Sequence, residues 1–249
     1  MADINVSTRG REPRKSAAGH PVATDFDWLI YADATFAGLA ILIPFPFLDA
    51  LLEEYFRRRM PRDIARRHGR TLAPAVVREV NRNRGGSCLG SCVMMPLELV
   101  IYVVRNLYRT VLYILSVYDA SEKLSFYWHR AFLLNYMIDR GHLDDMAHAP
   151  IAAQAMHRAL KTTQTSPLLN LAGELVAFAR THTRGLMRTI YRYIRREQET
   201  AEAKQTRASI AAQWAEFQDY LIGLADRYDA AYIAVEQEQQ AAAAESPKP

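Results

Sequence analysis

The sequence has few of the residues that cross-link small domains or interrupt helices. Of its 249 residues only 2 are cysteines, Cys88 and Cys92, and their spacing of one helical turn excludes a disulfide framework and favours a reducing compartment. Glycine and proline number 11 each, whereas 50% of the residues are hydrophobic, and Ala, Leu, Arg, Glu and Gln are frequent in the middle and C-terminal stretches. This composition predicts an all-α protein, a helical bundle with a sizeable core.

Lysine is scarce as well. The formal net charge is +4, and arginine supplies almost all of the positive side chains, because lysine occurs only at Lys15, Lys123, Lys161, Lys204 and Lys248. An excess of arginine is typical of phosphate binding, since the guanidinium group matches phosphate oxygens. A GC-rich genome produces the same excess without any function, so both interpretations stay open.

Catalytic motifs are absent from the sequence. The stretch GGSCLGS at 85–91 places two glycines and a serine where a phosphate-binding turn would have them. It lacks the spacing and the lysine of a P-loop, and Leu89 stands where a nucleophile elbow requires glycine. We interpret it as a glycine break before a helix, and the sequence predicts no catalytic residue and no cofactor.

No apolar run is long enough to cross a membrane as one helix. The longest uncharged run, residues 34–48, has 15 residues, whereas a spanning helix needs about 20. Pro44 and Pro46 interrupt it, so we expect a helix, a break and a second helix. The first 20 residues have no apolar segment of the kind found in secretory signals, and we expect a cytoplasmic protein.

A second apolar segment, around Pro96, resembles the first. When Pro44 is aligned with Pro96, LAILIP falls over SCVMMP and FPFLDALLEEYFRR over LELVIYVVRNLYRT, which indicates either a degenerate repeat or chance similarity. Arginines flank both segments on both sides, a pattern that suits segments entering and leaving a membrane on one face. The residues expected to contact the membrane are Ile41, Ile43, Phe45, Phe47, Met94 and Met95.

The basic stretch between the two apolar segments has three interpretations. It is a solvated helix that links two buried ones, or it binds anionic lipid headgroups through Arg57, Arg58, Arg59, Arg62, Arg66, Arg67 and Arg70. The third interpretation is nucleic-acid binding, because DIARRHGRTLAPAVVREV at 63–80 has the outline of a helix-turn-helix with Gly69 at the turn. Pro74 inside the second helix, and Arg70 and Arg78 at positions that such a unit normally buries, argue against it.

Helices are predicted most clearly in the C-terminal half. Ser166 and Pro167 form a preferred helix start, an N-cap followed by proline. His182 lies among the apolar residues that follow and is interpreted as a core histidine. A later apolar seam is expected to bind a helical partner or a second copy of the chain through Trp214, Phe217, Leu221, Leu224 and Tyr228. The polar stretch 197–207 leaves open whether this half forms a hairpin or one long helix.

One histidine-rich stretch has the spacing of a weak metal site. In HLDDMAH, His142 with Asp145, and Asp144 or Asp145 with His148, form pairs three or four residues apart that could share a helical face, with His157 as an extra ligand. A third ligand at a matching spacing is not evident, and aspartates at the start of a helix are also favoured by the helix dipole. The sequence therefore predicts no metal.

These observations lead to one favoured function and two alternatives. We divide the chain into a disordered basic tail (1–24), an apolar unit with two hairpin-like segments (25–120), short connecting helices (121–165), long amphipathic helices (166–238) and a second tail (239–249). The favoured function is a non-enzymatic scaffold or adaptor on the inner face of a membrane. The alternatives are a soluble all-α ligand-binding protein or enzyme whose apolar segments form the core, and a nucleic-acid-binding protein.

Overall fold

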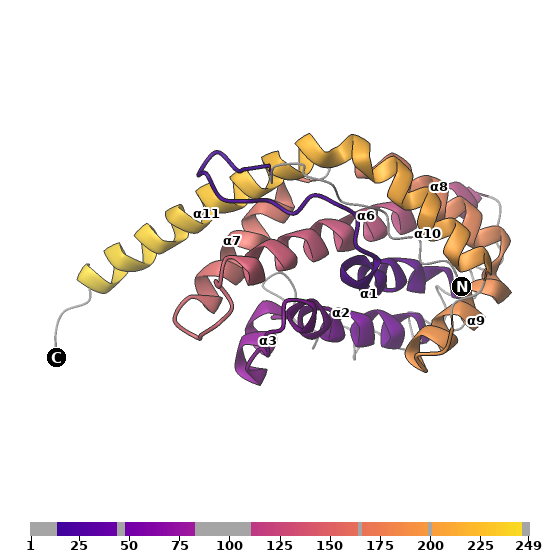
Figure 1. The fold of residues 1–249 in the computed structure, drawn as a ribbon, viewed down its shortest axis with the longest axis horizontal. Coiled ribbons are helices and arrows are strands. Elements are labelled where there is room, and N and C mark those ends of the chain that lie inside the picture. Colours follow the sequence, from indigo (N-terminus) through magenta and orange to yellow (C-terminus); the bar gives the residue numbers. More distant parts are fainter. Residues whose placement is uncertain (1–13, 44–47, 83–110, 164–165, 199–200, 246–249) are drawn as a thin grey trace, which may run out of the picture.

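The most apolar of the described helices, α1 (Trp28–Leu39), lies in the middle of the bundle (Figure 1). In the computed structural model its residues from Ile30 to Leu39 are all buried, because α1 packs against both α2 (Leu48–Arg67) and α6 (Val111–Asp139). A Cβ atom on Gly38 would lie 2.5 Å from the Cα atom of Leu124 in α6. Glycine at this position therefore allows the backbones of α1 and α6 to touch.

The structure describes residues 14–43, 48–82, 111–163, 166–198 and 201–245. Within these ranges the regular elements are helical, which confirms the predicted all-α class. The α2 helix and α3 (Pro74–Val80) lie on one side of α1 and α6, and α11 (Gln218–Glu245) runs along the opposite side and projects beyond the bundle (Figure 1). The remaining elements are η1 (Ala40–Leu42), α7 (Ala149–Lys161), α8 (Leu168–Thr181), α9 (Thr183–Ile194), α10 (Ala201–Trp214) and η2 (Ala215–Phe217).

The first proline break is confirmed. Helical structure ends with η1 at Leu42, before Pro44, and resumes at Leu48. The second apolar segment, with Met94, Met95, Cys88 and Cys92, lies outside the described residues, as do Phe45 and Phe47. Among the helices that are described, none has both the length and the apolar character needed to cross a bilayer.

The turn between α2 and α3 lies where Gly69 predicted it. Gly69 has a φ of +67°, a conformation that glycine adopts without strain. Pro74 is in the first turn of α3, where its fixed φ is favourable and its missing N–H leaves no bond unmade. Pro74 therefore does not lie inside the second helix, where the helix-turn-helix outline placed it, because α3 begins at the proline.

The described part of the N-terminal stretch, residues 14–27, packs along α11. The Ala17 N–H donates to Asp226 Oδ1 at 2.6 Å, and Trp214 Nε1 donates to the carbonyl oxygen of Thr24 at 3.1 Å. Val22 is buried in the core. Structure thus begins before the expected boundary at residue 24. At the other end, α11 extends to Glu245, past the expected boundary at residue 239.

The C-terminal half consists of several helices instead of one hairpin or one long helix. Its start agrees with the prediction, because Ser166 Oγ accepts a hydrogen bond from the Leu168 N–H at 3.1 Å. The chain turns at His182, between α8 and α9, and again at Arg196, after α9. These two turns place α9 and the start of α10 beside α1 and α2, where a cleft forms.

Candidate functional site

A cleft of roughly 560 Å3 opens between α1, α2, α9 and α10. This volume lies within the range of small-molecule sites, about 300–1,000 Å3. The lining side chains are Trp28, Leu29, Phe36, Arg59, Asp63, Arg66, Arg67, Thr189, Arg192, Tyr193, Arg196, Glu197, Ala203 and Arg207. We call this site the arginine cleft.

One wall of the arginine cleft is apolar and comes mainly from α1. The rings of Trp28 and Phe36 meet edge to face, with centroids 5.9 Å apart. The Phe36 ring also contacts the ring of Tyr193 on α9, and their centroids are 4.8 Å apart. Leu29 also lines the cleft and is 58% exposed, whereas Trp28 is half-buried and Phe36 is buried. The wall therefore offers apolar surface that a ligand could cover.

The rest of the lining is strongly cationic. It contains six arginines and only two acidic residues, Asp63 and Glu197. Guanidinium groups present several N–H donors in a plane and match carboxylate and phosphate oxygens. The combination of this charge with an apolar wall is suited to an organic anion.

The arginines on the α2 side of the cleft are paired with carboxylates. Arg66 Nη1 lies 2.8 Å from Asp63 Oδ1, and Arg67 Nε lies 2.8 Å from Asp27 Oδ2. On the α9 side the pair between Arg192 and Glu197 is longer, at 3.9 Å. Arg196 has no ion-pair partner among the described residues. The uncompensated positive charge therefore lies towards the α9 side.

A buried carboxyl group, outside the lining, contacts two of the lining side chains, Arg59 and Tyr193. Asp33 is only 2% exposed, and its Oδ1 accepts a hydrogen bond from the Tyr193 hydroxyl at 3.0 Å. Its Oδ2 lies 3.5 Å from Arg59 Nε and has no hydrogen-bond donor among the described residues. Arg59 binds Asp63 more closely, at 2.6 Å, and its guanidinium stacks 4.8 Å from the centre of the Tyr193 ring.

Burial raises the pKa of both acidic groups in this network, the Asp33 carboxyl and the Tyr193 hydroxyl. Loss of solvation raises the pKa of Asp33 to about 7, although the Arg59 guanidinium acts in the opposite direction. Burial and the neighbouring Asp33 carboxylate raise the pKa of the Tyr193 hydroxyl well above its usual value. Tyr193 therefore keeps its proton at neutral pH and is the donor to Asp33.

Arg196 has an unusual backbone conformation at the edge of the cleft. Its φ is +57°, the left-handed region in which residues with a Cβ atom are strained. The Arg196 N–H donates to the Tyr193 carbonyl at 3.1 Å and the Glu197 N–H to the Arg192 carbonyl at 2.9 Å. This pattern is a Schellman motif, which usually has glycine at the position of Arg196.

Comparisons with known proteins suggest no function for this chain. No protein family, curated protein or solved structure matches the chain. The other candidate sites on the described part of the chain are the α2 arginines, a second polar cluster, the apolar residues and the histidines.

Six of the seven arginines expected to face anionic lipid are paired with acidic side chains of the same chain. These arginines therefore have part of their charge compensated within the molecule, and three of them line the arginine cleft. Arg62 is exposed on α2, outside the lining. The pairs are Arg57 and Arg58 with Glu54, Arg59 with Asp33 and Asp63, Arg66 with Asp63, Arg67 with Asp27, and Arg70 with Asp144.

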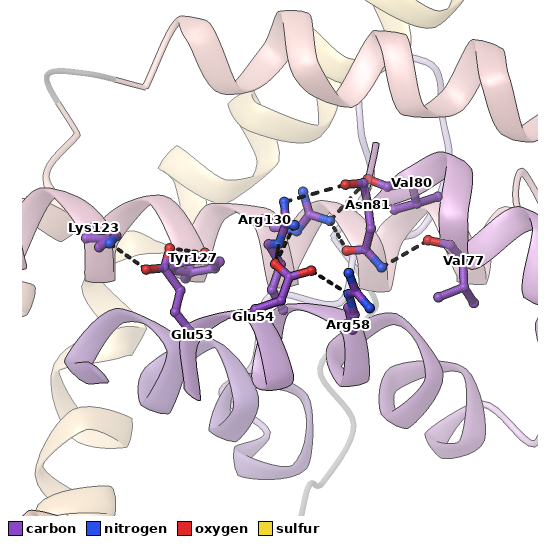
Figure 2. Close-up of polar contacts among 10 residues, drawn as sticks. Glu53, Glu54, Arg58, Val77, Val80, Asn81, Lys123, Tyr127 and Arg130 are labelled. Atoms are coloured by element: carbon purple, nitrogen blue, oxygen red, sulfur yellow. Dashed lines mark hydrogen bonds and ion pairs between the residues drawn. The ribbon is translucent and has the colours of Figure 1, made fainter. Parts of the chain in front are cut away.

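Figure 2 shows a second polar cluster, between α2, α3 and α6. Glu53 accepts hydrogen bonds from Lys123 Nζ at 2.6 Å and from the Tyr127 hydroxyl at 2.7 Å. Arg130, on α6, is buried and donates to Asn81 Oδ1 at 2.8 Å. Burial lowers the pKa of Arg130 to about 10, so it stays charged at neutral pH. These polar groups bond mainly to one another, and we assign the cluster a structural role in joining α3 to α6.

The apolar residues expected to contact a membrane or a partner face the protein's own core where they are described. Ile43 is buried and Ile41 packs against the core cluster. The residues of the C-terminal apolar seam also face the core, because α11 packs on α7 and α6. Phe217 is half-buried against the core, and Trp214, Leu221, Leu224 and Tyr228 are fully buried.

The histidines of the weak metal-site candidate, His142 and His148, bond to other side chains of the chain. His142 Nδ1 lies 2.7 Å from the Tyr228 hydroxyl, and its ring stacks on Tyr232. His148 pairs with Asp145 at 3.0 Å, and no group of three His, Cys, Asp or Glu residues in the described ranges is arranged to hold a metal ion. His182 is exposed at the turn between α8 and α9, so its assignment to the core is wrong.

Sequence reasoning missed the α9 side of the cleft. The letters YRYIRRE at 191–197 contain four of the lining residues, but arginines on an amphipathic helix usually form a solvated face. The one available signal was the interleaving of tyrosine and arginine. It becomes informative only when α1 places Trp28 and Phe36 opposite these arginines.

Proposed function

We propose that this protein binds a small organic anion in the arginine cleft. The observation that carries the proposal is the lining itself, in which six arginines and two acidic residues surround an apolar wall. Charge-assisted hydrogen bonds from guanidinium groups to phosphate or carboxylate are among the stronger polar interactions in proteins. The apolar wall excludes water on one side and strengthens these interactions.

This proposal corresponds to the ligand-binding alternative and is better supported than the membrane scaffold. The described members of the expected membrane surface are packed in the core, and the arginines of α2 are largely paired. An anionic lipid headgroup and a soluble phosphate nevertheless have the same chemistry. The experiment therefore distinguishes these two sources of the anion.

Isothermal titration calorimetry with inorganic phosphate, at low and high salt, tests the proposal. We expect saturable binding that weakens with added salt, because the arginines at the rim are partly exposed and screened. Arg192→Gln should weaken binding about tenfold, the effect of losing one charge-assisted hydrogen bond. Arg188→Gln is the matched control, because Arg188 is exposed on the same helix but does not line the cleft.

Flotation with vesicles that contain phosphatidic acid identifies the source of the phosphate. Co-flotation that Arg192→Gln abolishes would assign the site to a lipid headgroup. Binding of phosphate in solution without co-flotation would assign it to a free molecule. Equal affinities of the two arginine variants would show that the cleft is not the binding site.

A further inference from the structure

We infer that the ligand is a phosphate monoester with an apolar body, whose phosphate binds Arg192 and Arg196 and whose body covers Leu29 and the half-buried Trp28. This inference rests on the proposed function and specifies the class and the orientation of the ligand. It is carried by three separate features of the arginine cleft: the distribution of charge, the conformation of Arg196 and the exposed apolar wall.

The distribution of charge places the anionic group at the α9 side. Arg59, Arg66 and Arg67 each have a carboxylate within 2.8 Å, so an anion there would compete with an existing pair. Arg192 has only the 3.9 Å pair with Glu197, and Arg196 has no ion pair among the described residues. The carbonyl end of α9 carries a partial negative charge, but two of its carbonyls already accept bonds within the Schellman motif.

The conformation of Arg196 indicates that its side chain has a use. Glycine would adopt a φ of +57° without strain, and the Schellman motif needs nothing from the side chain. The fold keeps an arginine there, at a position that lines the cleft. Residues held in sparsely populated backbone conformations cluster at active sites and ligand-binding sites, where the surrounding structure holds them in place.

The presence of two arginines, Arg192 and Arg196, favours a doubly charged head group. Arg192 on α9 and Arg196 in the Schellman motif that ends this helix both line the cleft. Two guanidinium groups can share the oxygens of a doubly charged phosphate, whereas a carboxylate offers one charge and two oxygens. The site should therefore prefer a phosphate monoester over a carboxylate with the same body.

The apolar wall of the arginine cleft favours a ligand whose body is also apolar. Leu29 is 58% exposed and Trp28 is half-buried, whereas Phe36, which packs edge to face with Trp28, is buried behind them. The surface open to a ligand therefore belongs to Leu29 and Trp28. Inorganic phosphate at Arg192 and Arg196 would leave this surface in water. A short alkyl or aryl group on the phosphate would cover it and gain affinity from the hydrophobic effect.

Calorimetry with inorganic phosphate, hexyl phosphate and hexanoate tests the ligand class. We expect hexyl phosphate to bind at least about tenfold more tightly than inorganic phosphate, the gain from burying about two methylene groups, and more tightly than hexanoate. Leu29→Gln should weaken hexyl phosphate about fivefold and leave inorganic phosphate unchanged. Leu51→Gln is the control, because Leu51 is 67% exposed on α2 outside the cleft.

Arg196→Gly tests the head group without risk to the fold. We expect affinity for both phosphates to fall about tenfold, while the melting temperature stays the same or rises. Unchanged affinity in this variant would overturn the role of Arg196. Equal affinities for inorganic and hexyl phosphate would overturn the apolar body but leave the proposed function intact if Arg192→Gln still weakens both. Failure of all three probes to bind would overturn both proposals.

Discussion

Asp33→Asn should remove a pH dependence of stability that the buried carboxyl group gives to the protein. Asp33 is buried between α1, α2 and α9, where loss of solvation raises its pKa to about 7. The groups that face it are Arg59 and Asp63 from α2 and Tyr193 from α9. Asparagine has nearly the same shape as the protonated acid and can still accept the bond from Tyr193.

The sign of the effect follows from the two pKa values. In the unfolded chain Asp33 loses its proton near pH 4, whereas in the folded protein it keeps the proton up to about pH 7. The folded state therefore binds more protons between these values, and the stability is present at low pH and is lost as the pH rises through 7. From pH 5 to pH 8 this loss amounts to roughly 2–3 kcal/mol.

Urea unfolding at pH 5 and pH 8 measures the difference. The free energy of unfolding of the native protein should fall by roughly 2–3 kcal/mol relative to that of Asp33→Asn between these pH values. Asp49→Asn, at the start of α2, is the control for removal of a carboxyl group. If the native protein and Asp33→Asn change in parallel over this range, the carboxyl group is not protonated in the fold and the reasoning is wrong.

Three further predictions concern stability and protonation. Gly38→Ala should lower the free energy of unfolding in urea by about 1–3 kcal/mol, because the added Cβ would meet the Leu124 backbone at 2.5 Å; an unchanged midpoint would show that α1 can shift. Arg196→Gly should raise the same free energy by up to about 1 kcal/mol, and a loss would mean that the Arg196 side chain stabilises the fold. Burial lowers the pKa of His129 to about 4, so NMR should show its ring neutral at pH 5.5, and stability should decrease as the pH falls from 6.5 towards 4; a ring titrating near pH 6.5 would contradict this.

The sequence predicted those features of the fold that depend on neighbouring residues. The break before Pro44, the turn at Gly69 and the helix start at Ser166 are each determined by the conformational limits of one or two residues. The all-α class follows in the same way from the scarcity of glycine and proline. These limits act locally, so a single sequence is sufficient to detect them.

The partners of charged and apolar faces could not be predicted in the same way. Arg67 pairs with Asp27 and Arg70 with Asp144, residues that are 40 and 74 positions away. The apolar seam of α11 has the pattern of a helix that binds another helix, and periodicity does not distinguish a foreign helix from α7. Both cases have one cause, because the pattern gives the chemistry of a face and only the fold gives its partner within the chain.

The positions of the arginines support the proposed anion site over an effect of codon usage alone. The chain has 31 basic and 27 acidic residues, and its excess of positive charge is +4. Six of these basic residues and two of the acidic ones line the cleft, which leaves 25 of each sign for the rest of the chain. A GC-rich genome raises the arginine content without regard to position, so it does not explain why the lining carries an excess equal to that of the whole chain. A requirement to attract an anion to the apolar wall of α1 does explain it.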